Sequence, residues 1–461
     1  MIGADTLPNI VYILADDLGY GDVKCNNPDS KIPTPNVDRL AKEGMRFTDA
    51  HTPSAVCTPT RYGILTGRYC WRTWLTHRVL DGYDAPLIEK GQLTVPALLK
   101  KGGYQTACVG KWHLGTLTTK VKDANRARPG DSTHYSIPTM NGYDTYFVTE
   151  SKVPTYDPMF KPTLFDTEKG ESLRYGWKAV QNKNSAKDYG TFYWKGVELA
   201  ETENLDGDDS KIIMDRVIPF IENSVINKNP FFSTVWIHKP HLPIVANGKM
   251  MAEYSNYSYQ EQIYYATISA MDKQVGRLWK KLEELGEAEN TMIWVCSDNG
   301  PERGTPGSSG TFRELKRSLY EGGVRVPAFC VWPAKIKPGL VSDIPTVTSD
   351  YLPTIVDILK LNYPENRPVD GVSLAGVLNG NKKERTKPIG FRYQKKISWV
   401  TQKYKLISID KGATFELYNL LDDREERNNI ASENTELVNT MKSELFGWIE
   451  SCKKSDRGVD Y

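Results

Sequence analysis

The chain has 461 residues, of which 39% are hydrophobic and 25% are charged, so it can bury a large core and is not expected to be disordered. Its 59 Lys and Arg residues nearly balance its 57 Asp and Glu residues, and the net charge of +2 argues against general binding to nucleic acids or membrane surfaces. No apolar run approaches the roughly 20 residues that a membrane-spanning helix needs, so we expect a soluble globular protein.

Apolar, strand-like segments alternate with helical segments in the N-terminal part of the chain. The first of them, Asn9–Ala15, is typical of a strand that is buried on both faces of a parallel sheet. After it we expect strands at 105–109, 231–237 and 292–296, and helices at 35–44, 94–102, 210–225 and 260–285. This alternation predicts an α/β fold whose sheet contains parallel pairs.

Two regions differ from this pattern. Residues 115–210 are rich in Lys, Asp, Gly, Pro and Tyr, and we expect loops and hairpins there. Beyond a polar connection near 375–388, the chain has strand-like pieces at 397–401, 404–409 and 416–418 and an amphipathic helix at about 433–452. We therefore predict an N-terminal catalytic domain over residues 1–375 and a small α+β subdomain, an antiparallel sheet plus a helix, over residues 376–461.

Polar side chains follow two of the predicted strands at the point where each strand ends, which is where open α/β sheets bind ligands. Asp16 and Asp17 follow the first strand, and Asp298 and Asn299 follow the strand at 292–296. These residues offer only oxygen ligands, which suits Ca²⁺ or Mg²⁺ rather than Zn²⁺. Asp16 and Asp17 alone could equally cap a helix or lie in a solvated turn, but the two pairs together predict a divalent-cation site.

The seven cysteines are scattered and form no C-x-x-C pair, so they predict neither a zinc ribbon nor a disulfide-rich scaffold. One of them begins the most specific motif in the chain, Cys57-Thr58-Pro59-Thr60-Arg61. Read alone, this pentapeptide could be a turn with a chance cysteine and arginine. It resembles the C-x-[PS]-x-R signature of type I sulfatases, whose cysteine is oxidised to Cα-formylglycine.

Five further blocks resemble the same family and occur in the family's order. They are Asp16-Asp17, Gly110–Gly115, His238–Pro243, Ser297–Pro301 and Tyr320–Arg325. The pattern is similar to the branch that contains arylsulfatase A and galactosamine-6-sulfatase. This resemblance implies the alkaline-phosphatase-like fold, which is a large, mixed, mostly parallel sheet flanked by helices.

The resemblance also implies roles for the matched residues. Cys57, as formylglycine, carries the hydroxyl that attacks sulfur. It also completes the ligand set of the cation, which is Ca²⁺ or alternatively Mg²⁺. Arg61 stabilises the hydrated formylglycine, and His113 forms a hydrogen bond with its hydroxyl.

Two lysines are the sulfate ligands that the resemblance implies. Lys111 follows a strand in the block Gly-Lys-Trp-His, and Lys316 lies four residues before Tyr320. A lone lysine is ordinarily a solvated surface charge, so only the matched context supports this role. For Lys316, the neighbouring Arg313 or Arg317 could take the role after a shift of register.

Two of the six histidines, His238 and His241, lie in one block. His241 precedes Leu-Pro, as does the family's histidine that protonates the leaving alcohol, so His241 is the predicted general acid. His238 is predicted to contact the substrate or to support the site from behind, with a core-packed histidine as the alternative. Arg72, His77 and Arg78 follow the signature and are candidates for binding further charges of a polyanionic sugar.

Together these residues predict a sulfatase, a sulfuric ester hydrolase. The expected substrate is a sulfated saccharide, with galactose or N-acetylgalactosamine 6-sulfate as the first candidate. The alternatives are a formylglycine-dependent phosphonate or phosphodiester hydrolase and an inactive glycan-binding homologue. The other expected partner is a formylglycine-generating or anaerobic sulfatase-maturating enzyme that acts on Cys57, with no nucleic acid and no membrane span. We expect export to the periplasm, the cell surface or the medium, with the signal peptide removed from this sequence.

Overall fold

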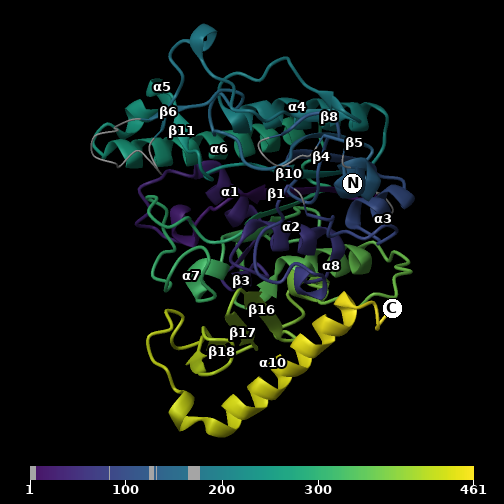
Figure 1. The fold of residues 1–461 in the computed structure, drawn as a ribbon, viewed down its shortest axis with the longest axis vertical. Helices are drawn as coiled ribbons and strands as arrows, with labels where there is room; N and C mark the ends of the chain where they lie inside the picture. Colours follow the sequence, from purple (N-terminus) through teal and green to yellow (C-terminus); the bar gives the residue numbers. More distant parts are fainter. Residues whose placement is uncertain (1–6, 83, 124–128, 131, 165–176) are drawn as a thin grey trace.

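The computed structural model describes residues 7–82, 84–123, 129–130, 132–164 and 177–461. Within these residues, a ten-stranded sheet has the order β14-β2-β13-β12-β1-β10-β4-β5-β8-β9 (Figure 1). Its strands are β1 (Asn9–Ala15), β2 (Met45–Phe47), β4 (Gln105–Lys111), β5 (Thr145–Thr149), β8 (Trp194–Gly196), β9 (Leu199–Ala200), β10 (Phe231–Trp236), β12 (Thr291–Ser297), β13 (Ala328–Val331) and β14 (Leu340–Ser342). Strands β12, β1, β10, β4 and β5 are parallel neighbours, whereas β13 and β8 pair antiparallel on either side. This confirms the predicted mixed, mostly parallel sheet.

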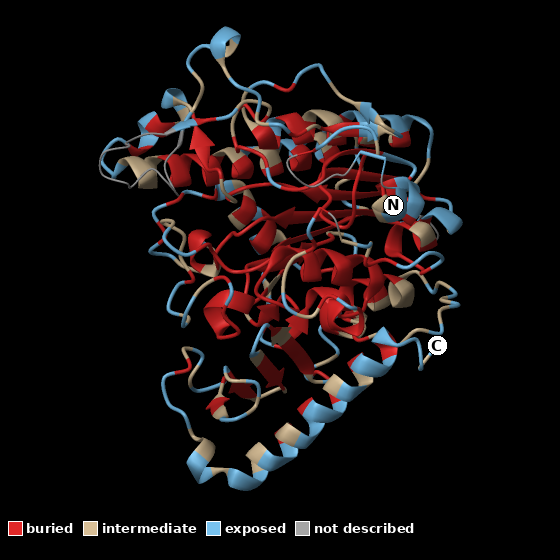
Figure 2. Cartoon of the chain, in the orientation of Figure 1, coloured by how far each residue is buried: buried red, intermediate tan, exposed pale blue. Residues whose placement is uncertain are grey.

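Strand β1 lies near the middle of the sheet because its residues are apolar on both faces. It pairs in parallel with β10 and β12, so that Leu14 lies opposite Trp236 on one side and Cys296 on the other. Successive side chains point to opposite faces, so Tyr12 packs into one core and Ile13 into the other. Figure 2 shows the buried residues, in red, gathered along the sheet and on the helices that cover it.

Helices cover both faces of the sheet. One face packs against α1 (Pro35–Glu43), α4 (Asp209–Ile226) and α6 (Tyr259–Glu284), and the other packs against α2 (Cys57–Thr66), α3 (Val95–Lys101) and α8 (Tyr351–Ile358). The start of α6 is fixed by a capping box, in which Ser258 Oγ accepts from the Glu261 amide and the Glu261 carboxylate accepts from the Ser258 amide. None of the helices in the described part of the chain is long and apolar enough to cross a membrane.

The region 115–210 differs from its predicted loops and hairpins in one respect. It contains β5, which pairs in parallel with β4 and extends the main sheet, and this strand was not predicted. The hairpin of β8 and β9 lies in the same region, as do β6 (Thr163–Leu164) and β7 (Trp177–Lys178), which join β11 (Val245–Ala246) in a small sheet. Residues 124–128, 131 and 165–176 lie outside the described chain.

The C-terminal part contains a four-stranded antiparallel sheet and a long helix, which confirms the predicted α+β subdomain. The strands are β16 (Ile389–Tyr393), β17 (Lys396–Val400), β18 (Tyr404–Ser408) and β19 (Glu416–Asn419), and the helix is α10 (Thr435–Asp456). Strand β16 was not predicted. The division of the chain at residue 375, where the short helix α9 (Ala375–Leu378) begins, stays a prediction.

A buried ion network joins this C-terminal sheet to the N-terminal part. Lys405 of β18 donates to Glu321 of the short helix α7 (Glu321–Val324) at 2.7 Å, and it lies 2.8 Å from Glu426. Glu321 also lies 3.1 Å from His51 Nε2 and accepts from Arg325 at 2.8 Å. All of these side chains are buried, so the two parts of the chain are held together by charges that have no access to water.

Replacing Lys405 with methionine should lower the free energy of unfolding by about 3–5 kcal/mol. The loss is expected because the carboxylates of Glu321 and Glu426 would stay buried without their shared cation. Denaturant unfolding followed by circular dichroism would measure it. The control is Lys403→Met in the turn before β18, where the partly exposed side chain makes a change within about 0.5 kcal/mol the expected result. Equal losses in the two variants would contradict this account of the network.

Candidate active site

The predicted site residues meet at one edge of the main sheet. Asp16 and Asp17 follow β1, Asp298 follows β12, Lys111 ends β4, and Cys57 is the first residue of α2. The carboxyl ends of β4, β1 and β12 lie at the same edge because these strands run parallel to β10 or to one another. All five side chains are buried, so the sheet topology gathers reactive groups in a place from which water is largely excluded.

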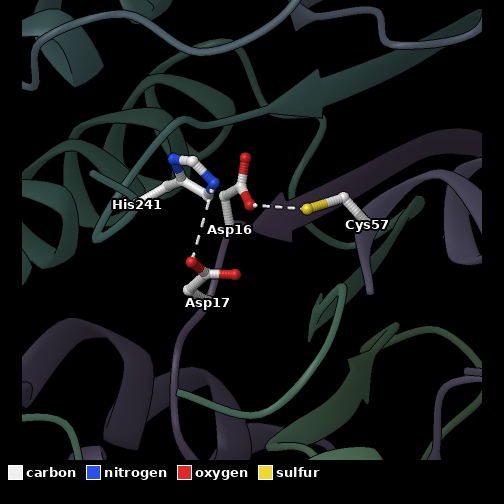
Figure 3. Close-up of side chains that lie close together, drawn as sticks. All are labelled: Asp16, Asp17, Cys57 and His241. Carbon is white, nitrogen blue, oxygen red and sulfur yellow. Dashed lines mark hydrogen bonds and ion pairs between the residues drawn. The ribbon is translucent and has the colours of Figure 1, made fainter. Parts of the chain in front are cut away.

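Cys57 and Arg61 lie one turn apart on α2 and both face the ends of the strands. Cys57 Sγ lies 3.5 Å from Asp16 Oδ1, and Figure 3 shows the two side chains pointing toward each other. Arg61 Nη2 lies 3.0 Å from Asp298 Oδ2 and 3.4 Å from Asp16, while Nη1 donates to the Lys111 carbonyl at 2.7 Å. Arg61 therefore fixes the position of Cys57 relative to three strand ends.

Two buried lysines complete the cluster. Lys111 Nζ donates to Asp16 Oδ2 at 2.5 Å, and Lys316 Nζ lies 2.5 and 2.7 Å from the two oxygens of Asp17. Their side chains are only 1% and 4% exposed. Burial disfavours the charge of Lys316, but Asp17 and its neighbours outweigh burial and raise the pKa of the ammonium group. Lys316 is therefore a cation at neutral pH, although almost no water reaches it.

The side-chain oxygen of Asn299 is a candidate ligand for a cation. Its Nδ2 donates to Asp17 Oδ1 at 2.7 Å, while its Oδ1 is buried and has no hydrogen-bond partner among the described residues. Burial, together with the neighbouring Asp16, raises the pKa of Asp298 to about 7. A hard divalent cation would bind the unpaired amide oxygen and offset the repulsion between the neighbouring carboxylates. The residues therefore fit Ca²⁺ or Mg²⁺.

Within the buried cluster, the carboxylates and the basic side chains are equal in number. Its anions and cations are Asp16, Asp17, Asp298, Arg61, Lys111 and Lys316. A divalent cation held by the carboxylates and by Asn299 would therefore leave a net positive pocket. Such a pocket favours a sulfate or phosphate group, whose own charge restores the balance.

His241 and His113 lie on loops beside the cluster. His241 Nε2 lies 3.8 Å from Asp17 Oδ2, and its Nδ1 hydrogen-bonds the Leu242 carbonyl at 2.6 Å, so Nε2 is the nitrogen that faces the site (Figure 3). Burial lowers the pKa of His241 well below its ordinary value. His113 has a left-handed backbone, with φ of 55°, and its Nε2 lies 3.2 Å from the Leu80 carbonyl.

Two roles were predicted for His238, contact with the substrate and support of the site from behind, and its hydrogen bonds favour the second. The side chain is fully buried, with Nε2 2.7 Å from Thr149 Oγ1 and Nδ1 2.9 Å from Asp209 Oδ2. Both ring nitrogens are therefore occupied by protein groups. This arrangement supports the block from behind, which is one of the two roles predicted from the sequence.

Arg72 was also predicted to bind substrate, and the structure contradicts this. Its Nε and Nη2 bind the carboxylate of Asp370 at 2.8 and 2.7 Å, and its Nη1 donates to Ser451 and Ser455 of α10 at 3.0 and 2.9 Å. The side chain is buried. These partners use its donors to attach the C-terminal helix, so Arg72 has a structural role.

His77 and Arg78 stay predictions. His77 is exposed, and Arg78 forms an ion pair with Asp84 while remaining partly exposed. The chain between them and the cluster passes Leu80, whose carbonyl contacts His113. The segment therefore runs beside the site, although the structure shows no contact of either side chain with the cluster in the described part of the chain.

Glu302 was missed by the sequence prediction. It is buried, with Oε2 3.5 Å from Lys316 Nζ and Oε1 bonded to Arg317. Arg313 instead hydrogen-bonds Tyr418 at 3.0 Å, so Lys316 is the member of its block that enters the cluster. The position of Glu302 directly after the block Ser297–Pro301 was the signal that could have identified it.

Comparison with known protein families gives two matches. The model described as Sulfatase matches residues 8–361, and the model described as N-sulphoglucosamine sulphohydrolase, C-terminal, matches residues 307–451. The chain is similar to an N-acetylgalactosamine-6-O-sulfatase of Bacteroides thetaiotaomicron, with 30% identity over 97% of this chain and 93% of that protein. It is also similar to arylsulfatase G of Rattus norvegicus, with 31% identity over 81% of this chain and 69% of that protein.

A solved structure has the same fold. The crystal structure of Ps i-CgsB in complex with k-i-k-neocarrahexaose is 26% identical and superposes with a TM-score of 0.81, covering 97% of this chain and 93% of that one. Nearly all of this chain therefore has a structural counterpart in that protein.

The cation site makes a prediction that does not depend on turnover. Protein carrying Cys57→Ser should bind Ca²⁺ or Mg²⁺ in preference to Zn²⁺. Asp17→Asn or Asn299→Leu should weaken that binding by about tenfold or more, because the first replaces a charged carboxylate with a neutral amide and the second removes an oxygen ligand. Titration calorimetry would measure the affinities. Asp206→Asn, which changes an exposed carboxylate outside the cluster, is the control. Unchanged Ca²⁺ affinity in both site variants would show that the cation binds elsewhere.

Proposed function

Because the chain belongs to the sulfatase family, whose members are sulfuric ester hydrolases, we propose that it hydrolyses sulfate esters of saccharides at the buried cluster. The observation that carries the proposal is the placement of Arg61, Lys111 and Lys316 around Cys57, because buried cations stabilise the charge that a sulfate carries and develops during its transfer. A similar protein named N-acetylgalactosamine-6-O-sulfatase supports N-acetylgalactosamine or galactose 6-sulfate as the first substrate class.

The thiol of Cys57 is unsuited to the reaction in its unmodified form. Burial, together with the nearby Asp16 and Asp298, raises the pKa of the thiol, so it stays protonated at neutral pH. Oxidation to Cα-formylglycine would replace it with an aldehyde, whose hydrate supplies one hydroxyl to attack sulfur and a second that expels sulfate after losing its proton. Asp16 Oδ1 lies 3.5 Å from Sγ, so a hydroxyl at position 57 would hydrogen-bond this carboxylate.

The cation of this proposal is Ca²⁺, with Mg²⁺ as the alternative. Asp16, Asp17, Asp298 and Asn299 would hold it together with the modified Cys57. When bound, it acts as a Lewis acid on a sulfate oxygen and orients the group for in-line attack. The unpaired Oδ1 of Asn299 supports this assignment.

The remaining residues would bind the sulfate and the leaving group. Lys111 and Lys316 would bind sulfate oxygens, and His113 would hydrogen-bond the hydroxyl at position 57. His241 Nε2 faces the site and would donate a proton to the departing alcohol. The negative charge of a bound sulfate ester raises the pKa of a neighbouring imidazole and so favours the protonated form that this role requires.

Maturation and location are part of the same proposal. Cys57 is only 3% exposed, so the enzyme that oxidises it, a formylglycine-generating or anaerobic sulfatase-maturating enzyme, would act before the chain folds. We propose that the mature protein is exported, where sulfated polysaccharides are available as substrates.

The nucleophile is tested by Cys57→Ala. This variant should lose all measurable sulfatase activity, because alanine cannot form the aldehyde, while its melting temperature changes little. Turnover of 4-nitrophenyl sulfate and of N-acetylgalactosamine 6-sulfate would be measured beside the mass of the Cys57 peptide. Cys25→Ala, outside the cluster, should keep full activity. Activity above a few per cent in Cys57→Ala would exclude the formylglycine mechanism, and faster turnover of an aryl phosphonate by the wild type would favour a phosphonate hydrolase.

The general acid is tested by the leaving group. His241→Ala should lower the rate on a sulfated sugar by about 10²–10⁴-fold, and much less on 4-nitrophenyl sulfate, whose phenolate leaves without a proton. The two substrates serve as each other's control under conditions in which chemistry limits the rate. Equal losses on both would show that His241 is not the acid and would make Lys316 the next candidate.

A further inference from the structure

Arg317 lies next to the buried cluster, because its ion-pair partner Glu302 also lies 3.5 Å from Lys316 Nζ. Its backbone amide donates to the carbonyl of Ala55 at 3.0 Å, two residues before Cys57. The preceding residue, Lys316, places its ammonium group inside the cluster against Asp17. Arg317 is therefore part of the loop that supplies a proposed sulfate ligand, and it is hydrogen-bonded to the loop that leads to Cys57.

The backbone of Arg317 sends its side chain in a different direction from that of Lys316. Arg317 has φ of 71°, a left-handed conformation that few residues other than glycine adopt and that tends to occur at functional sites. Its side chain is 44% exposed, whereas that of Lys316 is 4% exposed. The side chain of Lys316 thus lies in the cluster, and the side chain of the next residue, Arg317, reaches solvent.

Contacts from two sides hold Arg317 in this position. The buried carboxylate of Glu302 binds its Nη1 and also lies 3.5 Å from Lys316 Nζ. Lys396, at the start of β17 in the C-terminal sheet, donates to the Arg317 carbonyl at 2.5 Å. Lys396 thus holds the backbone and Glu302 holds the guanidinium, so the side chain loses less freedom when it binds a ligand.

One edge of the guanidinium faces away from these contacts. Within the described residues, its side-chain hydrogen bonds and ion pairs go to Glu302 through Nη1, and the edge formed by Nε and Nη2 has no protein partner. That edge presents two parallel N–H donors, the geometry that binds a carboxylate or a sulfate through both oxygens.

We propose that Arg317 binds a second anionic group of the substrate, carried by the sulfated sugar itself or by the sugar next to it, and so selects polyanionic saccharides. The second group is an oxyanion, either the carboxylate of a uronic acid or another sulfate ester. This inference rests on the proposed function, because it takes the buried cluster as the place where the first sulfate binds. Arg317 determines which substrates bind and takes no part in breaking the sulfate ester bond.

The test measures binding on Cys57→Ser protein, which cannot turn the probes over. The probes are N-acetylgalactosamine 6-sulfate, N-acetylgalactosamine 4,6-disulfate and the unsaturated disaccharide of chondroitin 6-sulfate, which differ in the second anionic group. We expect at least one doubly charged probe to bind about tenfold more tightly than the monosulfate, and Arg317→Gln to remove that advantage. Arg317→Lys should keep part of it, and Arg39→Gln, which removes an exposed cation of α1, should keep all of it.

The pattern of results identifies the second group or overturns the proposal. An advantage for the disulfate alone, or for the uronate-containing disaccharide alone, supports it and names the oxyanion. No advantage for either, an advantage that survives in Arg317→Gln, or an equal loss for all three probes in Arg317→Gln would overturn it, the last by showing that Arg317 only supports Lys316.

Turnover measurements distinguish a failure of this inference from a failure of the proposed function. In matured protein with Cys57 intact, Arg317→Gln should raise KM for the doubly charged probe by about tenfold and change turnover of 4-nitrophenyl sulfate by less than about twofold. Failure of the matured wild type to cleave any sulfate ester would remove the activity, while the binding measurements would still decide the role of Arg317.

Discussion

The guanidinium of Arg61 joins the helix that carries Cys57 to the ends of three strands. It reaches Asp16 after β1, the carbonyl of Lys111 at the end of β4, and Asp298 after β12. A charge buried this deeply costs several kcal/mol unless it is paired and hydrogen-bonded, so the strand ends and the helix have to keep one relative position. The cluster around Arg61 contains as many carboxylates as basic side chains, so a bound cation and a bound anion would each offset the charge of the other.

Much of the fold could be predicted because long buried strands and amphipathic helices leave a periodic pattern in the sequence. The strands that were missed depend on distant partners. β5 lies in a polar region and owes its burial to β4, and β16 contains Gly390, which breaks the apparent strand pattern. That glycine is needed because a Cβ there would lie 2.5 Å from the ring of Trp448 on α10, a contact that no local pattern reveals.

The same distinction holds for the site. Motif residues such as Cys57 and Asp298 were found because their spacing is specific, and the sheet topology brings them together. Arg72 was misassigned, and the role of His238 was left open, because both side chains have partners elsewhere in the chain, Asp370 and Asp209. A motif gives the chemical type of a side chain, but whether that side chain meets substrate or another part of the protein depends on burial, which only the folded chain determines.

The attachment of α10 through Arg72 bears on how such a protein can evolve. The helix lies along the outside of the molecule, with much of its surface exposed, and so resembles an appendage (Figures 1 and 2). Its hydroxyls at Ser451 and Ser455 nevertheless complete the coordination of an arginine that follows the helix bearing Cys57. Exchange of this C-terminal segment between relatives would leave a buried guanidinium without two of its acceptors. Recombination at this boundary would therefore succeed only between chains that both carry the arginine and its two serine acceptors. The two parts of the chain would then be inherited together.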